Sequence, residues 1–525
     1  MTARSRRWLW MYSGLLALAT SLPLLLASQV SGDAWRFSGF LIAVGDGNTY
    51  IAKMLLGSTG DWLFRTPYTL IPQRGVLLYL PYILLGKLAA GRSLHDQLVG
   101  LYHLLRVMSI PLFVFATYRF VARYLPRESD RRLATFLATA GAGLGWLLLA
   151  FGGSPGWDSI PLSFISPETF GFLATMTAPH LILARACLLF GLTAYLETQE
   201  RQRASWAGQL WLLATFLVSP LTGATLIVVI GAEQLYRLGI ASRSGAWAVW
   251  WHGARLTIRM ALLSVPYVAY LAVIYLQDPF LHGWATQNRL PSPHLGYYAF
   301  AYGWLLVPAA FGVREMWTSR LKADLFPLIW LLLFPVLAYA PVGVQRRLID
   351  GLWVALVTLT VLGLSTLGER SRRKWQAAVV VLALPSTMIL LVGSTRLASQ
   401  PAEPAFLPAD QVAVFEAMAE SAQPGQVAFT DFSTANALPA WVPLRVPIGH
   451  GPESVDLAAM EQVVATFFGA PSTAERLAIA REYDVDWVVV SPAVRAMGVG
   501  ASWGPAWAEK LERGAYTLYR WLGSE

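Results

Sequence analysis

The chain has 525 residues, of which 55% are hydrophobic, 14% are charged and 13% are aromatic. An average soluble chain is about 25% charged, so this one has too few charges to cover the surface that a soluble protein of this length exposes to water. The composition excludes a soluble cytoplasmic enzyme, a disordered chain and a fibrous protein, and it predicts an integral membrane protein.

The formal net charge of +9 hides an asymmetry along the chain. Residues 401–525 hold 15 acidic and 7 basic residues, whereas residues 1–400 hold 16 acidic and 33 basic ones. A basic excess in a membrane region is typical of cytoplasmic loops. The sequence has no basic stripe with interleaved aromatic residues, of the kind that binds single strands, so we expect no nucleic-acid partner.

Eleven apolar runs are long enough to predict membrane-spanning helices. The first, residues 8–28, follows Arg4, Arg6 and Arg7 and lacks an A-x-A cleavage site, which favours an uncleaved helix with a cytoplasmic N-terminus. The run at 76–91 is shorter, and we expect it to lie beside the membrane without crossing it. The other runs cover residues 97–124, 132–152, 176–197, 205–218, 220–237, 256–277, 297–314, 324–341, 350–367 and 375–395.

Eleven crossings place the basic loops RYLPRESDRR and GERSRRK on the cytoplasmic side, as the positive-inside rule favours. The long first loop, residues 29–96, and the C-terminal region are then outside. We predict a mainly α, multi-pass protein of the plasma (inner) membrane, with a polytopic transmembrane domain at residues 1–397 and a small extracytoplasmic α/β domain at residues 398–525. In the latter we expect strands at 426–432, 444–449, 486–492 and 515–521, and helices at 456–468, 472–483 and 506–513.

Ionisable side chains within a membrane protein are functional candidates, because burying a charge in lipid costs free energy. Asp46 lies in the turn-prone tetrad Gly45-Asp46-Gly47-Asn48 of the first outer loop. Its small neighbours would let a bulky substrate approach the carboxylate, which could accept a proton from an acceptor hydroxyl. The alternative interpretation is a turn or cap residue for the helix that begins near Asn48.

Glu168 follows a proline and begins an apolar segment. It is our candidate for a second catalytic carboxylate, facing Asp46 across a cavity. As a first-turn glutamate it would instead only favour the helix dipole. We find no metal-binding motif, and the metal content is left open, since Asp46 and Glu168 could share a divalent cation. We predict no other cofactor.

Two adjacent arginines, Arg346 and Arg347, are expected on the outer side, against the positive-inside bias. Arginine binds phosphate through parallel hydrogen bonds, so these residues and the neighbouring Asp350 are candidates for binding a phosphate-bearing substrate. The alternative is an ion pair between one arginine and Asp350 at a helix start.

Four further residues complete the candidate substrate-binding group. Arg185 lies inside an apolar run and needs a partner, for which an anionic head group is a candidate. His180 precedes it near the start of the same helix and could instead be a packing residue. His103 and Arg106 are three residues apart and share a helix face, which could equally be a solvated face at the interface.

The order of these features resembles the GT-C class of integral membrane glycosyltransferases: a first helix, a long outer loop with an aspartate near its start, about ten more helices and an outer soluble tail. The architecture is similar to that of protein mannosyltransferases and bacterial aminoarabinose transferases. A poorly characterised bacterial branch is similar in motif as well, in D-x-x-x-Y-x-A-K-M at residues 46–54, R-R-x-x-[DE]-G-L at 346–352 and GHGPESVD at 449–456. The mannosyltransferases usually carry Asp-Glu where this sequence has Asp46-Gly47, which leaves the second carboxylate unassigned.

The resemblance implies a glycosyltransferase that uses a polyprenyl-phosphate-linked sugar within membrane lipid and an unknown acceptor. It implies that Asp46 deprotonates or positions the acceptor hydroxyl, and that Arg346 or Arg347 holds the charge that grows on the leaving phosphate. Two other functions fit a polytopic protein: a transporter or flippase of a lipid-linked substrate, and a non-catalytic membrane scaffold. Transporters often carry internal repeats, which we do not find here, and a scaffold requires no outward cluster of Asp, Glu and Arg.

Overall fold

The computed structural model describes residues 1–152, 159–319, 324–470, 472–498 and 503–523. The chain forms two compact units, and each unit is built from segments that are far apart in the sequence. The helical unit comprises Met1–Leu22, Leu104–Ala272 and Leu290–Gly393. The loop–tail unit comprises Pro23–His103, Val273–Arg289 and Ser394–Glu525. The sequence-based prediction places residues 29–96 in the membrane domain. In the structure they cluster with the C-terminal segment.

Helices dominate the fold, as expected from the composition. Four of them have residues in both units: α1 (Ala3–Val30), α4 (Leu94–Val121), α13 (Val265–Gln277) and α21 (Pro385–Ala398). The other helices of the helical unit are α5 (Glu128–Ala140), α6 (Gly145–Ala150), α7 (Leu162–Ile165), α8 (Gly171–Thr177), α9 (Pro179–Arg201), α10 (Trp206–Val218), α11 (Pro220–Ser244), α12 (Trp247–Ala261), α15 (Leu295–Tyr298), the π-helical turn η1 (Ala299–Gly303), α16 (Trp304–Thr318), α17 (Phe326–Leu332), α18 (Phe334–Ala338), the 3-10 turn η3 (Gln345–Ile349), α19 (Leu352–Ser365) and α20 (Glu369–Ala383).

Six helical segments in the described part of the chain are long and apolar enough to cross a membrane, and the count is seven if α12 and α13, bent by 68°, form one span. A count of eleven is not confirmed, because several apolar runs form shorter helices. In the run at 132–152, α5 ends at Ala140 and Gly141 is extended. In the run at 324–341, α17 ends at Leu332 and a new short helix, α18, begins at Phe334 with Pro335 in its first turn, because proline cannot continue α17. The six segments are Ala3–Val30, Leu94–Val121, Pro179–Arg201, Pro220–Ser244, Gln345–Ser365 and Glu369–Ala398.

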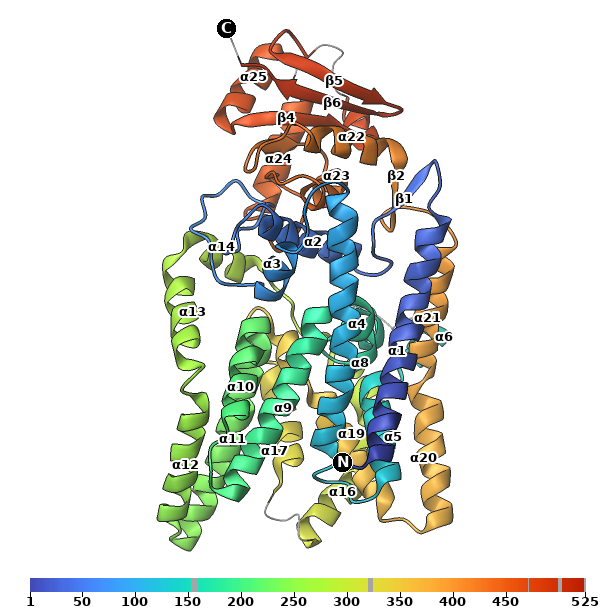
Figure 1. Cartoon of the computed structure of the whole chain (residues 1–525), viewed down its shortest axis with the longest axis vertical. Coiled ribbons are helices and arrows are strands. Elements are labelled where there is room, and N and C mark those ends of the chain that lie inside the picture. The colour runs from blue at the N-terminus through green and yellow to red at the C-terminus, as the bar shows by residue number, and fades with distance from the viewer. Residues whose placement is uncertain (153–158, 320–323, 471, 499–502, 524–525) are drawn as a thin grey trace. The chain divides into compact units, whose positions relative to one another are not determined.

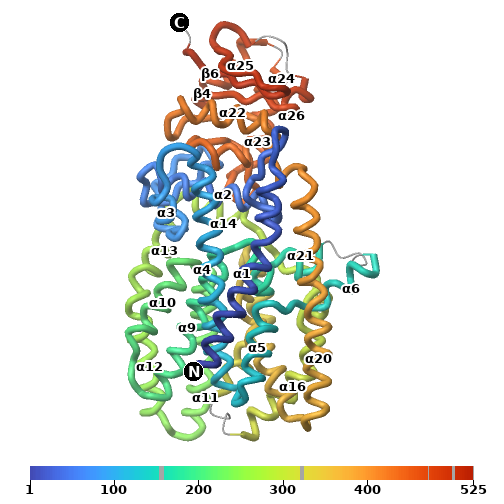
Figure 2. Tube along the Cα trace, turned by 45° about the vertical axis from the view of Figure 1, so that its right-hand side comes forward, coloured from blue at the N-terminus to red at the C-terminus, as the bar shows by residue number. Residues whose placement is uncertain are grey.

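Within the helical unit, α9, α10, α11 and α12 pack against one another, and both views show them side by side (Figures 1 and 2). The core of the unit is α19, whose residues from Leu352 to Leu364 are all buried. A helix that is apolar on every side is buried inside a bundle. It packs against α16, α17 and α5, so the bundle surrounds the segment that follows Asp350.

The loop–tail unit combines one short strand and two helices of the first loop with an α/β tail (Figure 1). Strands β3 (Val427–Phe429), β4 (Val485–Val490), β5 (Trp507–Arg513) and β6 (Tyr516–Trp521) form a sheet in the order β3-β4-β6-β5. The β3–β4 pair is parallel and the other two pairs are antiparallel. The other elements are β1 (Trp35–Phe37), α2 (Val44–Ser58), α3 (Leu80–Gly86), α14 (Pro279–Gln287), β2 (Phe406–Pro408), α22 (Ala409–Ala419), α23 (Phe432–Ala437), the 3-10 turn η4 (Leu438–Ala440), α24 (Leu457–Gly469), α25 (Thr473–Glu482) and α26 (Pro492–Ala496).

Two expectations for the tail are wrong. Residues 506–513 were expected to be helical, yet Trp507–Arg513 is strand β5 and pairs with β6. Ala, Glu, Lys and Leu favour a helix locally, but the turn at Gly514, with φ of +50°, folds this segment back as a hairpin. The stretch 444–449 forms only an isolated bridge from Arg445 to Val427.

The first loop positions α2 through close packing on α3. A Cβ on Gly57 of α2 would lie 2.0 Å from the carbonyl oxygen of Ile83, and one on Gly86 of α3 would lie 1.8 Å from that of Met54. Only glycine permits this approach of the two backbones. Helix α3 has seven residues, about 10 Å of helix, so the run at 76–91 is too short to span a membrane, in line with the expectation.

Candidate functional site

Asp46 lies in the first turn of α2, within the loop–tail unit. Its side chain is 56% exposed, and its Oδ1 lies 3.2 Å from Nε2 of His450, which is 13% exposed. An acidic residue is favoured in the first helical turn by the helix dipole. The helix begins at Val44, not near Asn48, and its N-cap is Ala43, so the interpretation of Asp46 as a turn or cap residue is wrong. The turn also places the carboxylate where a substrate can reach it.

Asn436, from the tail, holds the backbone around Asp46. Its Nδ2 donates to the carbonyl oxygen of Gly449 at 2.8 Å and to that of Gly45 at 3.4 Å. Its Oδ1 accepts a hydrogen bond from Asn48 Nδ2 at 2.8 Å. Gly45 and Asn48, on either side of Asp46, are therefore bound to the same amide, and so is Gly449, the residue before His450.

A buried ion pair joins α2 to the same tail segment. Lys53 Nζ lies 2.7 Å from Glu453 Oε1, and the two side chains are only 1% and 4% exposed. Thr66 Oγ1 donates to the other oxygen of Glu453 at 2.5 Å. Burial opposes ionisation of Glu453, but the Lys53 ammonium and the two hydrogen bonds outweigh it and hold the pKa of this carboxyl below its ordinary value of 4.5.

We expect this ion pair to make stability depend on acid pH. A carboxyl whose pKa falls on folding stabilises the fold above its ordinary pKa, and the contribution is lost as the pH falls through the lowered pKa. The thermal unfolding midpoint of the wild type should therefore drop on acidification below about pH 4.5. Glu453→Gln, which cannot ionise, should lack this part of the pH dependence, whereas exposed Glu420→Gln should keep it. Equal pH slopes for Glu453→Gln and the wild type would contradict this role.

His450, Glu453 and Lys53 were missed as site residues, although the sequence carried a signal. Lys53 belongs to the D-x-x-x-Y-x-A-K-M stretch and the other two belong to GHGPESVD. These two motifs are about 400 residues apart in the chain, and the structure pairs them directly. Nothing in local sequence predicts such a pairing.

In the helical unit, Arg185 and Asp350 form a second buried ion pair. Arg185 Nε donates to Asp350 Oδ1 at 2.6 Å, and the side chains are 2% and 1% exposed. Thr222 Oγ1 donates to Asp350 Oδ2 at 2.9 Å, and Arg185 Nη2 donates to the carbonyl oxygen of Glu168 at 3.1 Å. The expectation that Asp350 pairs with Arg346 or Arg347 is wrong, since Arg185 on α9 takes that place.

Glu168 lies in the turn before α8, and its side chain contacts Arg347, one of the two adjacent arginines. Its Oε1 is 3.3 Å from Arg347 Nε, and Ser166 Oγ donates to its Oε2 at 3.3 Å. The Nε of Arg346 is buried and has no hydrogen-bond partner within the described residues. The structure thus brings Glu168, Arg185, Arg347 and Asp350 together in one unit, while Asp46 belongs to the other.

Three further candidates have contacts of their own. His103 Nε2 lies 2.8 Å from the carbonyl oxygen of Gly39 in the loop–tail unit. Arg106 is buried and donates to Thr20 Oγ1, Ser21 Oγ and the carbonyl oxygen of Thr175, so it ties α1, α4 and α8 together. The interpretation of Arg106 as part of a solvated face is therefore wrong. His180 is partly buried at the start of α9.

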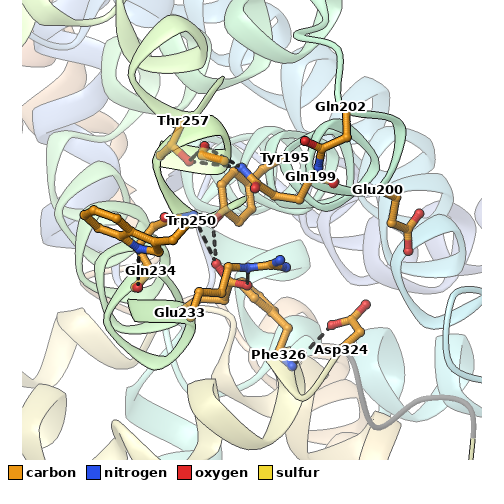
Figure 3. A network of polar contacts seen from close by, with 12 residues as sticks. Tyr195, Gln199, Glu200, Gln202, Glu233, Gln234, Trp250, Thr257, Asp324 and Phe326 are labelled. Atoms are coloured by element: carbon orange, nitrogen blue, oxygen red, sulfur yellow. Dashed lines mark hydrogen bonds and ion pairs between the residues drawn. The ribbon is translucent and has the colours of Figure 1, made fainter. Parts of the chain in front are cut away.

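The helical unit also contains a larger polar network whose residues the sequence did not indicate as a group (Figure 3). Tyr195 on α9 donates to Glu233 on α11, and Gln199 donates to Thr257 Oγ1 on α12 at 3.0 Å. Glu233 is 11 residues from Thr222 on α11, about 16 Å along the axis. The network therefore holds three helices together away from the Arg185–Asp350 pair.

Within the described ranges, no group of three or more His, Cys, Asp or Glu residues could hold a metal ion. Asp46 contacts one residue of this kind, His450. We derive no step through a metal.

No protein-family model and no curated protein matches the sequence. Among solved structures, the chain is similar to ArnT from Cupriavidus metallidurans bound to undecaprenyl phosphate, with a TM-score of 0.52 and 12% identity over 97% of this chain and 98% of that one. It is also similar to the arabinofuranosyltransferase AftD from Mycobacteria, with a TM-score of 0.57 and 16% identity over 99% of this chain and 42% of that one. The chain is a multi-pass membrane protein with the GT-C fold of these membrane glycosyltransferases.

Proposed function

We propose that this protein is a glycosyltransferase that moves a sugar from a polyprenyl-phosphate-linked donor to an acceptor hydroxyl. The observation that carries the proposal is Asp46, a carboxylate more than half exposed at the start of α2 and hydrogen-bonded through one oxygen to His450. The fold shared with ArnT and AftD supports the reaction class. The undecaprenyl phosphate bound to ArnT supports the donor class.

In the proposed reaction, the acceptor oxygen attacks the anomeric carbon of the donor sugar while Asp46 takes the proton of the hydroxyl. The new glycosidic bond forms as the bond from the anomeric carbon to the phosphate oxygen breaks. Polyprenyl phosphate leaves with that electron pair. The products are the glycosylated acceptor, the lipid phosphate and the proton on Asp46, which returns to water.

The charge that develops on the leaving phosphate needs a cation. We assign Arg346 to this role, since its Nε is buried without a hydrogen-bond partner within the described residues. Arg347 is already paired with Glu168, so Glu168 would hold this second arginine in place, and its role as a second catalytic carboxylate stays a prediction. Preorganised donors at a developing charge contribute about 2.7–4 kcal/mol each in oxyanion holes.

We place the reaction at the outer face of the plasma (inner) membrane. The basic loops RYLPRESDRR and GERSRRK support a cytoplasmic side opposite to the first loop. The N-terminus would then be cytoplasmic, and residues 398–525 would be extracytoplasmic, next to Asp46 on the same side.

The proposal is tested by the polyprenyl-phosphate lipids of a deletion strain. We expect the mass spectrum to show one sugar-linked lipid that accumulates on deletion and declines when the wild-type gene is restored. The purified protein added to membranes that hold this lipid should convert it to polyprenyl phosphate. A flippase would leave the lipid chemically intact, and a scaffold would cause no accumulation, so either result would overturn the proposal.

A further inference from the structure

The tail contributes a side chain to the proposed active site. Nε2 of His450 lies 3.2 Å from Asp46 Oδ1, although the two residues are 404 positions apart. The histidine is 13% exposed and the aspartate is 56% exposed. The ring therefore lies behind the carboxylate, and the carboxylate is the group that a substrate meets. We propose that His450 is the positioning residue that orients Asp46 for proton transfer, an inference that rests on the proposed function.

The surroundings of His450 decide which ring nitrogen carries the proton. Nδ1 is buried and has no hydrogen-bond partner among the residues that the structure describes. A buried N–H without an acceptor is disfavoured. In the neutral ring the hydrogen is therefore on Nε2, and this N–H donates a hydrogen bond to Asp46 Oδ1. The hydrogen bond made by one ring nitrogen thereby fixes the role of the other.

The backbone around His450 is fixed by the tail itself. Gly449 has φ of +130°, and a Cβ there would lie 2.7 Å from the backbone carbon of Ala435. The carbonyl oxygen of His450 accepts from the backbone N–H of Ser454 at 2.8 Å and from that of Glu453 at 3.1 Å. The ring is thus presented from a tight turn and has little freedom to move away.

Two side-chain contacts hold this turn on α2. Asp46 and Lys53 are seven residues apart on the helix, so they lie on the same face. Their partners, His450 and Glu453, are three residues apart on the turn. The buried Lys53–Glu453 pair anchors the turn, and His450 then fixes one oxygen of the exposed carboxylate.

The experiment measures how fast the protein consumes the sugar-linked lipid that accumulates in the deletion strain. Membranes of that strain supply the lipid, and purified full-length variants are added. His450→Ala should lower the rate by about 10- to 100-fold, the size of effect that a misplaced catalytic group causes. His450→Gln, whose amide N–H can reach the place of Nε2, should recover most of the rate. The Asp46→Asn/His450→Ala double variant should be no slower than Asp46→Asn alone.

A matched control separates orientation from folding. His95 is a buried histidine of the same unit that stacks on Trp441 and contacts the carbonyl oxygen of Ala440. These ring contacts of His95 do not involve Asp46. His95→Ala should lower the unfolding temperature and leave the rate per folded molecule unchanged.

Each other outcome overturns the inference. A normal rate for His450→Ala would do so, as would a Gln variant as slow as Ala. A further loss in the double variant would show that His450 acts independently of Asp46. If His450→Ala loses rate only in proportion to folded protein, as His95→Ala does, its role is structural. Failure of the proposed function is separate, because either no lipid would then accumulate in the deletion strain or the wild-type protein would not consume it.

Discussion

Asp46→Asn is expected to lower the rate of sugar transfer by about 10²- to 10⁴-fold, the range for loss of a general base. Asparagine has the same shape and can still accept a hydrogen bond from His450 through its amide oxygen. It cannot take a proton from the acceptor hydroxyl. Because the Asp46 side chain is more than half exposed, the substitution leaves no buried charge unpaired, and the unfolding temperature should change little.

The matched control for this variant is Asp61→Asn. Asp61 is a second partly exposed carboxylate of the first loop, and it pairs with Arg65 at 3.2 Å. An exposed ion pair contributes about 0–1 kcal/mol, so this variant should keep both rate and stability. Both variants are assayed by the decline of the accumulated sugar-linked lipid in membranes of the deletion strain. A wild-type rate for Asp46→Asn, or an equal loss in Asp61→Asn, would remove Asp46 from the catalytic role.

Local sequence patterns predicted the features that depend on local physics. The apolar runs predicted the long helices. The alternative interpretation of Asp46 placed a helix close to it, although α2 begins at Val44 rather than near Asn48. Alternating patterns predicted strands in three stretches that contain β3, β4 and β6 in the structure. These features follow from the period of the apolar residues and from turn chemistry within a few residues.

The pairings between distant residues could not be predicted in this way. Arg346, Arg347 and Asp350 are neighbours in the sequence, which suggested an ion pair among them. Asp350 instead binds Arg185, 165 residues away. His450 likewise reaches Asp46 only because the first loop and the tail fold into one unit. Strand β5 shows the same principle, since its pairing with β6 overrides a helical propensity.

The buried pair in the helical unit leads to the largest expected effect on stability. Arg185→Ala should lower the free energy of unfolding by about 3–5 kcal/mol, because it leaves the Asp350 carboxylate buried without its cation. Asp350→Ala should lower the free energy of unfolding by a similar amount, because it leaves the Arg185 guanidinium buried without its anion. Thr222 Oγ1 still donates to Asp350 in the Arg185 variant, but a neutral hydroxyl cannot balance the charge.

The double variant Arg185→Ala/Asp350→Ala distinguishes an unpaired charge from lost packing. When both charges are removed, neither is left buried alone, so the loss should be clearly smaller than the sum of the two single losses. Arg346→Ala is the matched control: its partly exposed side chain has no hydrogen-bond partner at Nε within the described residues, so unfolding should stay close to that of the wild type. The measurement is thermal unfolding of the purified variants in the same detergent. Additive losses, or an Arg346→Ala loss as large as that of Arg185→Ala, would show that the Arg185–Asp350 pair does not stabilise this bundle as a charge pair.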